Sequence, residues 1–190
     1  MQQEYELKIG ELKEDAFYEV FGKGTRLELK NGTFSIGKLA IGLQQFDMAT
    51  KKQLGYITCF ISLDKALSLA HDILSGRLVK ESADHEWPAP IRSIPGGQPA
   101  TKANRPDGKP LYREFSIAKG KLWVLKGQEG PGKVTETGGF APDGKAEKSI
   151  SVGVSDDTLR TIALMIQTEY QAYRTAQYYY TLQMQKGNPT

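Results

Sequence analysis

The sequence predicts an α+β protein with two related antiparallel β-sheet units, each of about four strands followed by one helix. A short phrase occurs twice, as residues 34–38 (FSIGK) and residues 115–119 (FSIAK). A strand pattern that leads directly into a helix pattern also occurs twice, and a segment rich in Pro and Gly separates the two copies. We therefore expect one internally duplicated domain over residues 1–190.

The first unit is assigned to residues 1–80 and has a strand pattern at 26–30 (RLELK) ahead of the FSIGK phrase, which we expect to open the next strand. Residues 56–62 (YITCFIS) alternate apolar and other side chains, which is typical of a half-buried strand. A helix pattern follows Ser62, a favourable N-cap residue. Its apolar residues recur at helical spacing at Ala66, Leu69, Ala70 and Ile73.

Residues 81–110 form the expected connection between the two units. This segment holds most of the nine prolines in the chain, and its apolar residues show almost no periodicity. Such a composition is typical of a linker or a long crossing loop.

The second unit, residues 111–190, repeats the order of the first. A weak strand pattern near Leu111 precedes the FSIAK phrase, which we also expect to lie in a strand. Residues 149–155 (SISVGVS) then alternate like the matching strand of the first unit. The second unit is longer, and its extra residues fall in the turn-rich segment 127–147, which we expect to bulge out as a loop. The short turns favour antiparallel pairing.

The two strand-to-helix segments align without a gap. Ser155 and Asp157 fall on Ser62 and Asp64, as N-cap and first-turn acid. Short similarities also arise by chance, and many strand-to-helix segments resemble one another. Agreement at both ends of the unit, in the same order, favours duplication over chance.

The last helix is predicted to run from Ser155 to about Gly187, whereas the first helix stops at Gly76. Its apolar and aromatic residues follow a heptad seam, formed by Leu159, Ala163, Ile166, Tyr170, Tyr173, Gln177, Tyr180 and Met184. We expect this seam to be buried against the first unit or against a second subunit. A nucleic-acid surface formed by its tyrosines is the less favoured interpretation.

Composition sets the broad class. The formal net charge of +3 and the pI of about 8.8 permit contact with nucleic acid but do not argue for it strongly. No apolar run approaches the length of a membrane span, and the start of the chain lacks a secretory pattern. The single Cys59 fits a reducing compartment, so we expect a cytoplasmic protein.

No motif in the sequence indicates an enzyme. Residues 127–134 (GQEGPGKV) nearly match a phosphate-binding loop, but Val134 replaces the magnesium-binding Ser or Thr, and no helix pattern follows. His71 and His85, together with one cysteine, do not make a recognisable metal site. We therefore expect no catalytic residue, no metal and no cofactor.

The order of four antiparallel strands and one helix, entered through Ser-x-Asp, resembles the positive cofactor four family of single-stranded-DNA-binding coactivators. A tandem pair of such units resembles the Whirly family, in which two four-stranded sheets pack across each other. The lysines of a Whirly strand motif are matched here only by Lys119-Gly120-Lys121, in the second unit. The resemblance implies binding of single-stranded DNA or RNA. It also implies assembly into a dimer or tetramer, in which we expect the last helix to take part.

Binding to single strands needs cations for phosphates and flat rings for bases. The candidate residues near the repeated phrase are Lys38, Phe46, Tyr112, Arg113, Lys119, Lys121, Trp123 and Lys126. The alternation of Trp123 with Lys121 and Leu125 does not decide which face of the sheet the indole occupies. Each residue also has a plain structural interpretation, as part of the core or as a solvated lysine that protects a sheet edge. The competing hypothesis for the whole chain is an assembly protein that does not bind nucleic acid.

Overall fold

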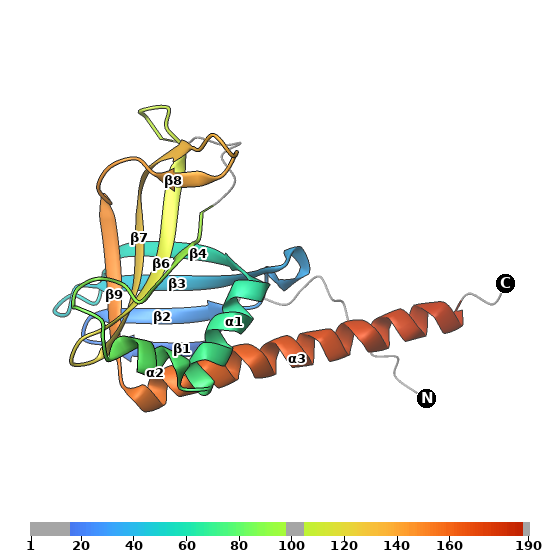
Figure 1. Ribbon diagram of the computed structural model, residues 1–190. Helices are drawn as coiled ribbons and strands as arrows, with labels where there is room; N and C mark the ends of the chain where they lie inside the picture. Colours follow the sequence, from blue (N-terminus) through green and yellow to red (C-terminus); the bar gives the residue numbers. More distant parts are fainter. Residues whose placement is uncertain (1–15, 98–104, 188–190) are drawn as a thin grey trace.

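The structure is a computed structural model that describes residues 16–97 and 105–187. It contains two antiparallel sheets, three α-helices and one short 3-10 helix, as Figure 1 shows. The elements of the first part are β1 Ala16–Gly22, β2 Thr25–Lys30, η1 Phe34–Ile36, β3 Lys38–Phe46, β4 Gln53–Ser62, α1 Leu63–Leu74 and α2 Arg77–Ser82. Those of the second part are β5 Arg92–Pro95, β6 Leu111–Lys119, β7 Trp123–Val134, β8 Phe140–Pro142, β9 Lys148–Val154 and α3 Asp156–Gly187.

The two sheets have the same chain order. The first sheet runs β1-β2-β3-β4, and β4 leads directly into α1. In the second sheet β5, β6 and β7 are neighbours, β9 pairs with β7, and β9 leads into α3. The prediction of an α+β fold with two antiparallel sheets and a long last helix is therefore confirmed. The extra residues of the second unit form the β8 hairpin, which extends the far end of β7.

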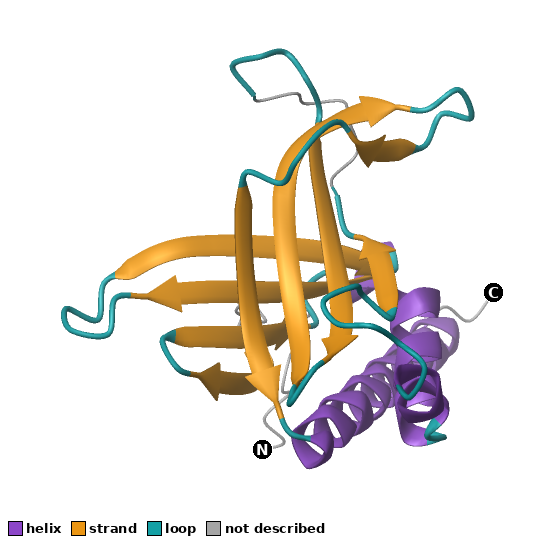
Figure 2. Ribbon diagram, turned by 60° about the vertical axis from the view of Figure 1, so that its left-hand side comes forward, coloured by secondary structure: helices purple, strands orange, loops and turns teal. Residues whose placement is uncertain are grey.

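Both sheet-to-helix junctions are built as the alternation indicates. Ile57, Cys59 and Ile61 of β4 are fully buried, and Ile150, Val152 and Val154 of β9 are buried in the same way. The second sheet crosses the first sheet, and the helices lie beside the crossing (Figure 2). Together they enclose a continuous apolar core.

The repeated phrase does not mark equivalent positions, and this part of the prediction is wrong. Residues 115–117 lie within β6, whereas Phe34–Ile36 form the 3-10 helix η1. The residue that follows explains the difference, because Gly37 has a left-handed φ of 71° and donates its backbone N–H to Phe34 O at 2.9 Å. Ala118 stands at the matching place in the second phrase, and an alanine there favours continuation of the strand.

Three strands form where the patterns predicted none: β1, β5 and, within the expected loop 127–147, β8. β1 pairs with β2 along the edge of the first sheet, ahead of the RLELK strand. β5 pairs with β6 although it lies within the expected connection 81–110. β5 ends at Pro95 on a sheet edge, which is where proline is tolerated in a strand.

Helix α3 has 32 residues, which corresponds to a length of about 48 Å. Its first part packs against α1, and Phe34 of η1 lies between the rings of Tyr170 and Tyr173, with centroids 6.1 and 5.5 Å away. The later part runs past both sheets and protrudes from the body of the molecule (Figure 1). The seam is thus buried within its own chain only over its first half.

Gly127 provides the test of how closely the two sheets pack. A Cβ at this position would lie 2.7 Å from Leu43 Cδ1 and 3.4 Å from Ile57 Cγ2. We expect Gly127→Val to lower the free energy of unfolding by about 1–3 kcal/mol, because the extra carbons overpack the sheet-to-sheet contact. Urea denaturation measures this change.

Gly97→Val is the control, because a Cβ there meets only ordinary contacts at 3.6 Å or more. Equal stability of the two variants would contradict the close approach at Gly127.

Candidate nucleic-acid interface on the first sheet

The first sheet has an inner face covered by the second sheet and the helices, and an outer face that the other described elements leave open (Figure 2). Alternation places even-numbered residues of β2, β3 and β4 on this outer face. Arg26, Gln44 and Tyr56 lie in one cross-strand row, and Lys30, Ala40 and Phe60 lie in another. In both rows a cation of β2 and an aromatic ring of β4 flank a buried residue of β3, and the cations and rings are half-buried.

Arg26 is held between two phenyl rings and two carboxylates. Its guanidinium lies 5.9 Å from the ring centroids of both Phe21 and Phe46. It pairs with Glu19 Oε1 at 3.1 Å and with Glu28 Oε1 at 2.6 Å. Phe21 is 69% exposed, which is unusual for a phenylalanine on a sheet.

Glu28 is the central acid of the outer face. Its side chain is buried although it is charged, with only 4% of the residue exposed. Arg26 precedes it and Lys30 follows it on the same face of β2, and Lys30 Nζ lies 3.2 Å from Glu28 Oε2. Glu28 therefore neutralises both flanking cations, and their positions are fixed by the acid between them.

A shallow cavity of about 180 Å³ opens on the same face, and Lys30, the ion-pair partner of Glu28, lines it. Lys30 Nζ lies 5.8 Å from the centroid of the Tyr56 ring, which is one wall of the cavity. The lining residues are Lys30, Gly32, Thr33, Ala40, Tyr56, Thr58 and Phe60. Two aromatic rings, three hydroxyl groups and one ammonium group thus line this space. A flat ligand with a negatively charged group fits such a lining.

Two residues predicted from the repeated phrase belong to this outer face, Lys38 and Phe46, at opposite ends of β3. The sequence prediction missed Phe21, Tyr56 and Phe60. The alternation in β4 contains a signal for the last two, because residues that alternate with Ile57, Cys59 and Ile61 must face away from the core. Phe21 lies in β1, a strand that the patterns did not predict.

Lys119 and Trp123 lie together at the junction between the second sheet and α3. Trp123 is 0% exposed and its indole N–H donates to Asp156 Oδ1. Lys119 Nζ lies 2.7 Å from the same oxygen and 4.5 Å from the indole centroid. The hydrogen bond from Lys119, and then that from Trp123, hold the pKa of Asp156 below its ordinary value. Trp123 is therefore a core residue, which corrects its assignment to a base-stacking surface.

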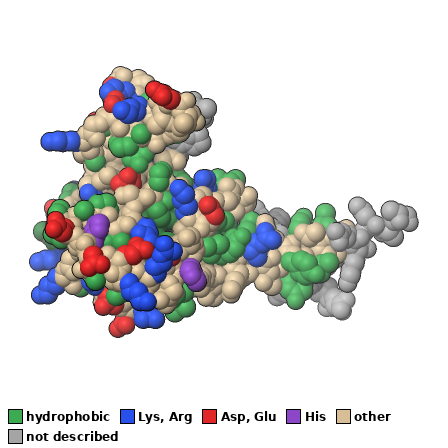
Figure 3. Space-filling view, viewed as in Figure 1, with side chains coloured by type: hydrophobic (Ala, Val, Ile, Leu, Met, Phe, Trp, Pro, Cys, Tyr) green, Lys and Arg blue, Asp and Glu red, His purple; other side chains and the backbone are tan. Residues whose placement is uncertain are grey.

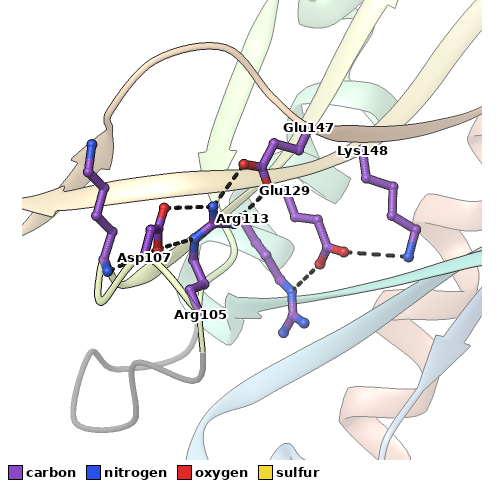
Figure 4. A network of polar contacts seen from close by, with 7 residues as sticks. Arg105, Asp107, Arg113, Glu129, Glu147 and Lys148 are labelled. Atoms are coloured by element: carbon purple, nitrogen blue, oxygen red, sulfur yellow. Dashed lines mark hydrogen bonds and ion pairs between the residues drawn. The ribbon is translucent and has the colours of Figure 1, made fainter.

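Arg113 also forms an ion pair with an acidic residue of its own chain. Its Nε donates to Glu129 Oε2 at 3.0 Å, and Lys148 Nζ lies 3.4 Å from Glu129 Oε1 (Figure 4). Lys148 in turn donates to the backbone oxygen of Tyr56 at 2.6 Å, so this network joins the two sheets.

Tyr112 is buried on the face of the second sheet opposite to that of its neighbour Arg113, because successive residues of a strand face opposite sides. Its hydroxyl donates to Glu114 Oε2 at 3.0 Å. Burial, followed by the charge of Glu114, raises the pKa of Tyr112 to about 12. Lys121 is exposed and Lys126 is half-buried, and neither forms an ion pair within the described part of the chain. The eight predicted residues therefore do not form one surface.

The phosphate-binding-loop match and the single cysteine both lie in strands. The near match to a phosphate-binding loop, residues 127–134, lies within strand β7. Burial raises the pKa of the Cys59 thiol to about 12, so this sulfur is not an activated nucleophile. Within residues 16–97 and 105–187, no group of His, Cys, Asp and Glu side chains is arranged to hold a metal ion.

No helix in the described part of the chain combines the length and the apolar character that a membrane crossing requires. Comparison of the chain with protein-family models, with curated proteins and with solved structures finds no match.

Trp123 provides a direct test of its placement in the core. We expect Trp123→Ala to lower the free energy of unfolding by about 3–5 kcal/mol, because it removes a large, fully buried side chain. Trp123→Phe keeps most of the apolar volume but loses the hydrogen bond to Asp156. It should therefore lower the free energy of unfolding by less than Trp123→Ala does. Urea denaturation of both variants measures the difference. A Trp123→Ala variant as stable as the parent chain would contradict the buried position.

Proposed function

We propose that this chain binds single-stranded nucleic acid, DNA or RNA, on the outer face of the first sheet, without catalysing a reaction. The observation that carries the proposal is the set of rings and cations on that face, of which Phe21 is exposed and the others are half-buried: Phe21, Arg26, Lys30, Phe46, Tyr56 and Phe60. Unpaired bases expose flat apolar surfaces, and aromatic side chains on a sheet can stack on them whatever their sequence. Two crossed sheets, each followed by a helix, agree with this interpretation.

Stacking is the main attraction that this face offers. Three cations, Arg26, Lys30 and Lys38, share it with two acids, Glu19 and Glu28, so it carries one net positive charge. Few counterions would be released when a strand binds, and the affinity should fall only gently as salt rises. A base stacked on each ring contributes about 1–3 kcal/mol.

Removal of an exposed ring tests the location of the site. We expect Phe21→Ala to weaken binding of a labelled single-stranded oligonucleotide by about 1–3 kcal/mol, measured by fluorescence anisotropy. Its stability should change little, because the ring is mostly exposed. Tyr179→Ala is the control, since Tyr179 is a similarly exposed ring on α3. Loss of affinity in the control alone would place the binding site on the helix.

Removal of the central acid tests the electrostatics of the same face. We expect Glu28→Gln to tighten oligonucleotide binding and to steepen its salt dependence, because Arg26 and Lys30 lose the carboxylate that neutralises them. The matched control is Glu129→Gln, which removes one negative charge from between Arg113 and Lys148.

If Glu28→Gln and Glu129→Gln raised the affinity for the oligonucleotide equally, the cause would be a general charge effect rather than a site on the first sheet. Weaker binding after Lys121→Ala with Lys126→Ala, and unchanged binding after Phe21→Ala, would move the site to the second sheet. No binding of the parent chain even at low salt would overturn the proposal as a whole.

The second candidate function is assembly without nucleic acid. The observation that favours it is the neutralisation of so many cations by acids of the same chain, including Arg26, Lys30, Arg113 and Lys119. Absence of oligonucleotide binding, together with a defined oligomer, would support it.

A further inference from the structure

The heptad seam of α3 changes its environment along the helix. Leu159, Ala163 and Ile166 are buried within the chain, with Ile166 only 2% exposed. Further along the same seam, Tyr180 is 49% exposed and Met184 is 58% exposed. The face that packs against α1 and η1 therefore continues, without a change in spacing, into solvent.

The exposed part of α3 lacks the charges that normally solvate a surface helix. Residues 175–185 contain no Lys, Arg, His, Asp or Glu. In Figure 3 the described end of this projection shows green and uncharged side chains beyond one blue group at its base, whereas red and blue groups crowd the body of the molecule. A projecting helix with exposed aromatic and apolar side chains and no charges is the kind of surface that often marks an interaction site.

We infer that this distal part of α3 docks, through Gln177, Tyr180 and Met184, against the same segment of a second copy of the chain. Two neutral helices can meet without repulsion between like charges. Tyrosine hydroxyls and glutamine amides each donate and accept, so identical faces can satisfy one another. The chain already forms such a pair, because Gln177 Nε2 donates to Tyr173 Oη.

Other partners fit this surface less well. Nucleic acid and anionic lipid surfaces are held by cations, and residues 175–185 contain none. A strongly charged protein partner would leave its charges without opposite groups on this segment. The docking of two copies continues the seam that already packs within the chain, and it does not depend on whether the first sheet binds nucleic acid.

A charge placed on the seam tests this inference in the full-length chain. We expect the parent chain to sediment with twice the single-chain mass of 21.0 kDa. Tyr180→Glu should weaken self-association about tenfold or more, because docking would bury an unpaired carboxylate. Thr175→Glu is the matched control, since Thr175 is exposed on the opposite side of the same helix.

Sedimentation equilibrium over a range of concentrations measures the association, and circular dichroism checks that both variants keep their helix content. A dimer in the parent and in Thr175→Glu, with single chains in Tyr180→Glu, would support the inference. A parent chain that remains a single chain at high concentration would overturn it. Self-association that survives Tyr180→Glu unchanged, or that both variants lose equally, would also overturn it, because the seam would then not be the docking face.

Discussion

The inner face of the first sheet is too long for one element to cover. The second sheet covers one end, where Gly127 of β7 lies against Leu43 and Ile57. Helices α1 and α3 pack on each other beside it, and Phe34 is held between Tyr170 and Tyr173. Because the core consists of these two parts, α3 must begin at the second sheet and reach the far end of the first.

This constraint explains why the strand-to-helix junctions were the most predictable part of the fold. β4 and β9 both carry strict alternation followed by a helix start, since one face of each strand and one face of each helix enter the same core. The local sequence was sufficient to predict the structure of these junctions. It was not sufficient to predict η1, because the same Phe-Ser-Ile phrase forms a turn before Gly37 and a strand before Ala118. β5 depends on its neighbour β6 rather than on a pattern of its own.

The candidate site was predicted less well than the fold, for a physical reason. A lysine or arginine in a sequence does not reveal which acid will lie across the sheet from it. Lys119 meets Asp156, and Arg113 meets Glu129, only after distant strands pair. The sequence prediction also missed Tyr56 and Phe60, although the alternation that buries Ile57 and Cys59 is enough to place both rings on the other face of β4.

Within the described part of the chain, helix α3 is attached to the body of the molecule only over its N-terminal half, so a change of its direction there moves its distal end. Asp156 at its start is tied to Lys119 and Trp123 of the second sheet, while its next turns pack on α1, which belongs to the first. A small rotation between the two sheets would therefore be amplified along about 48 Å of helix. A spectroscopic label near Met184, paired with one on β3, would report such a rotation as a change in distance. A slight bending of the sheets would likewise become a large displacement of the distal end of α3 and of any molecule bound to it.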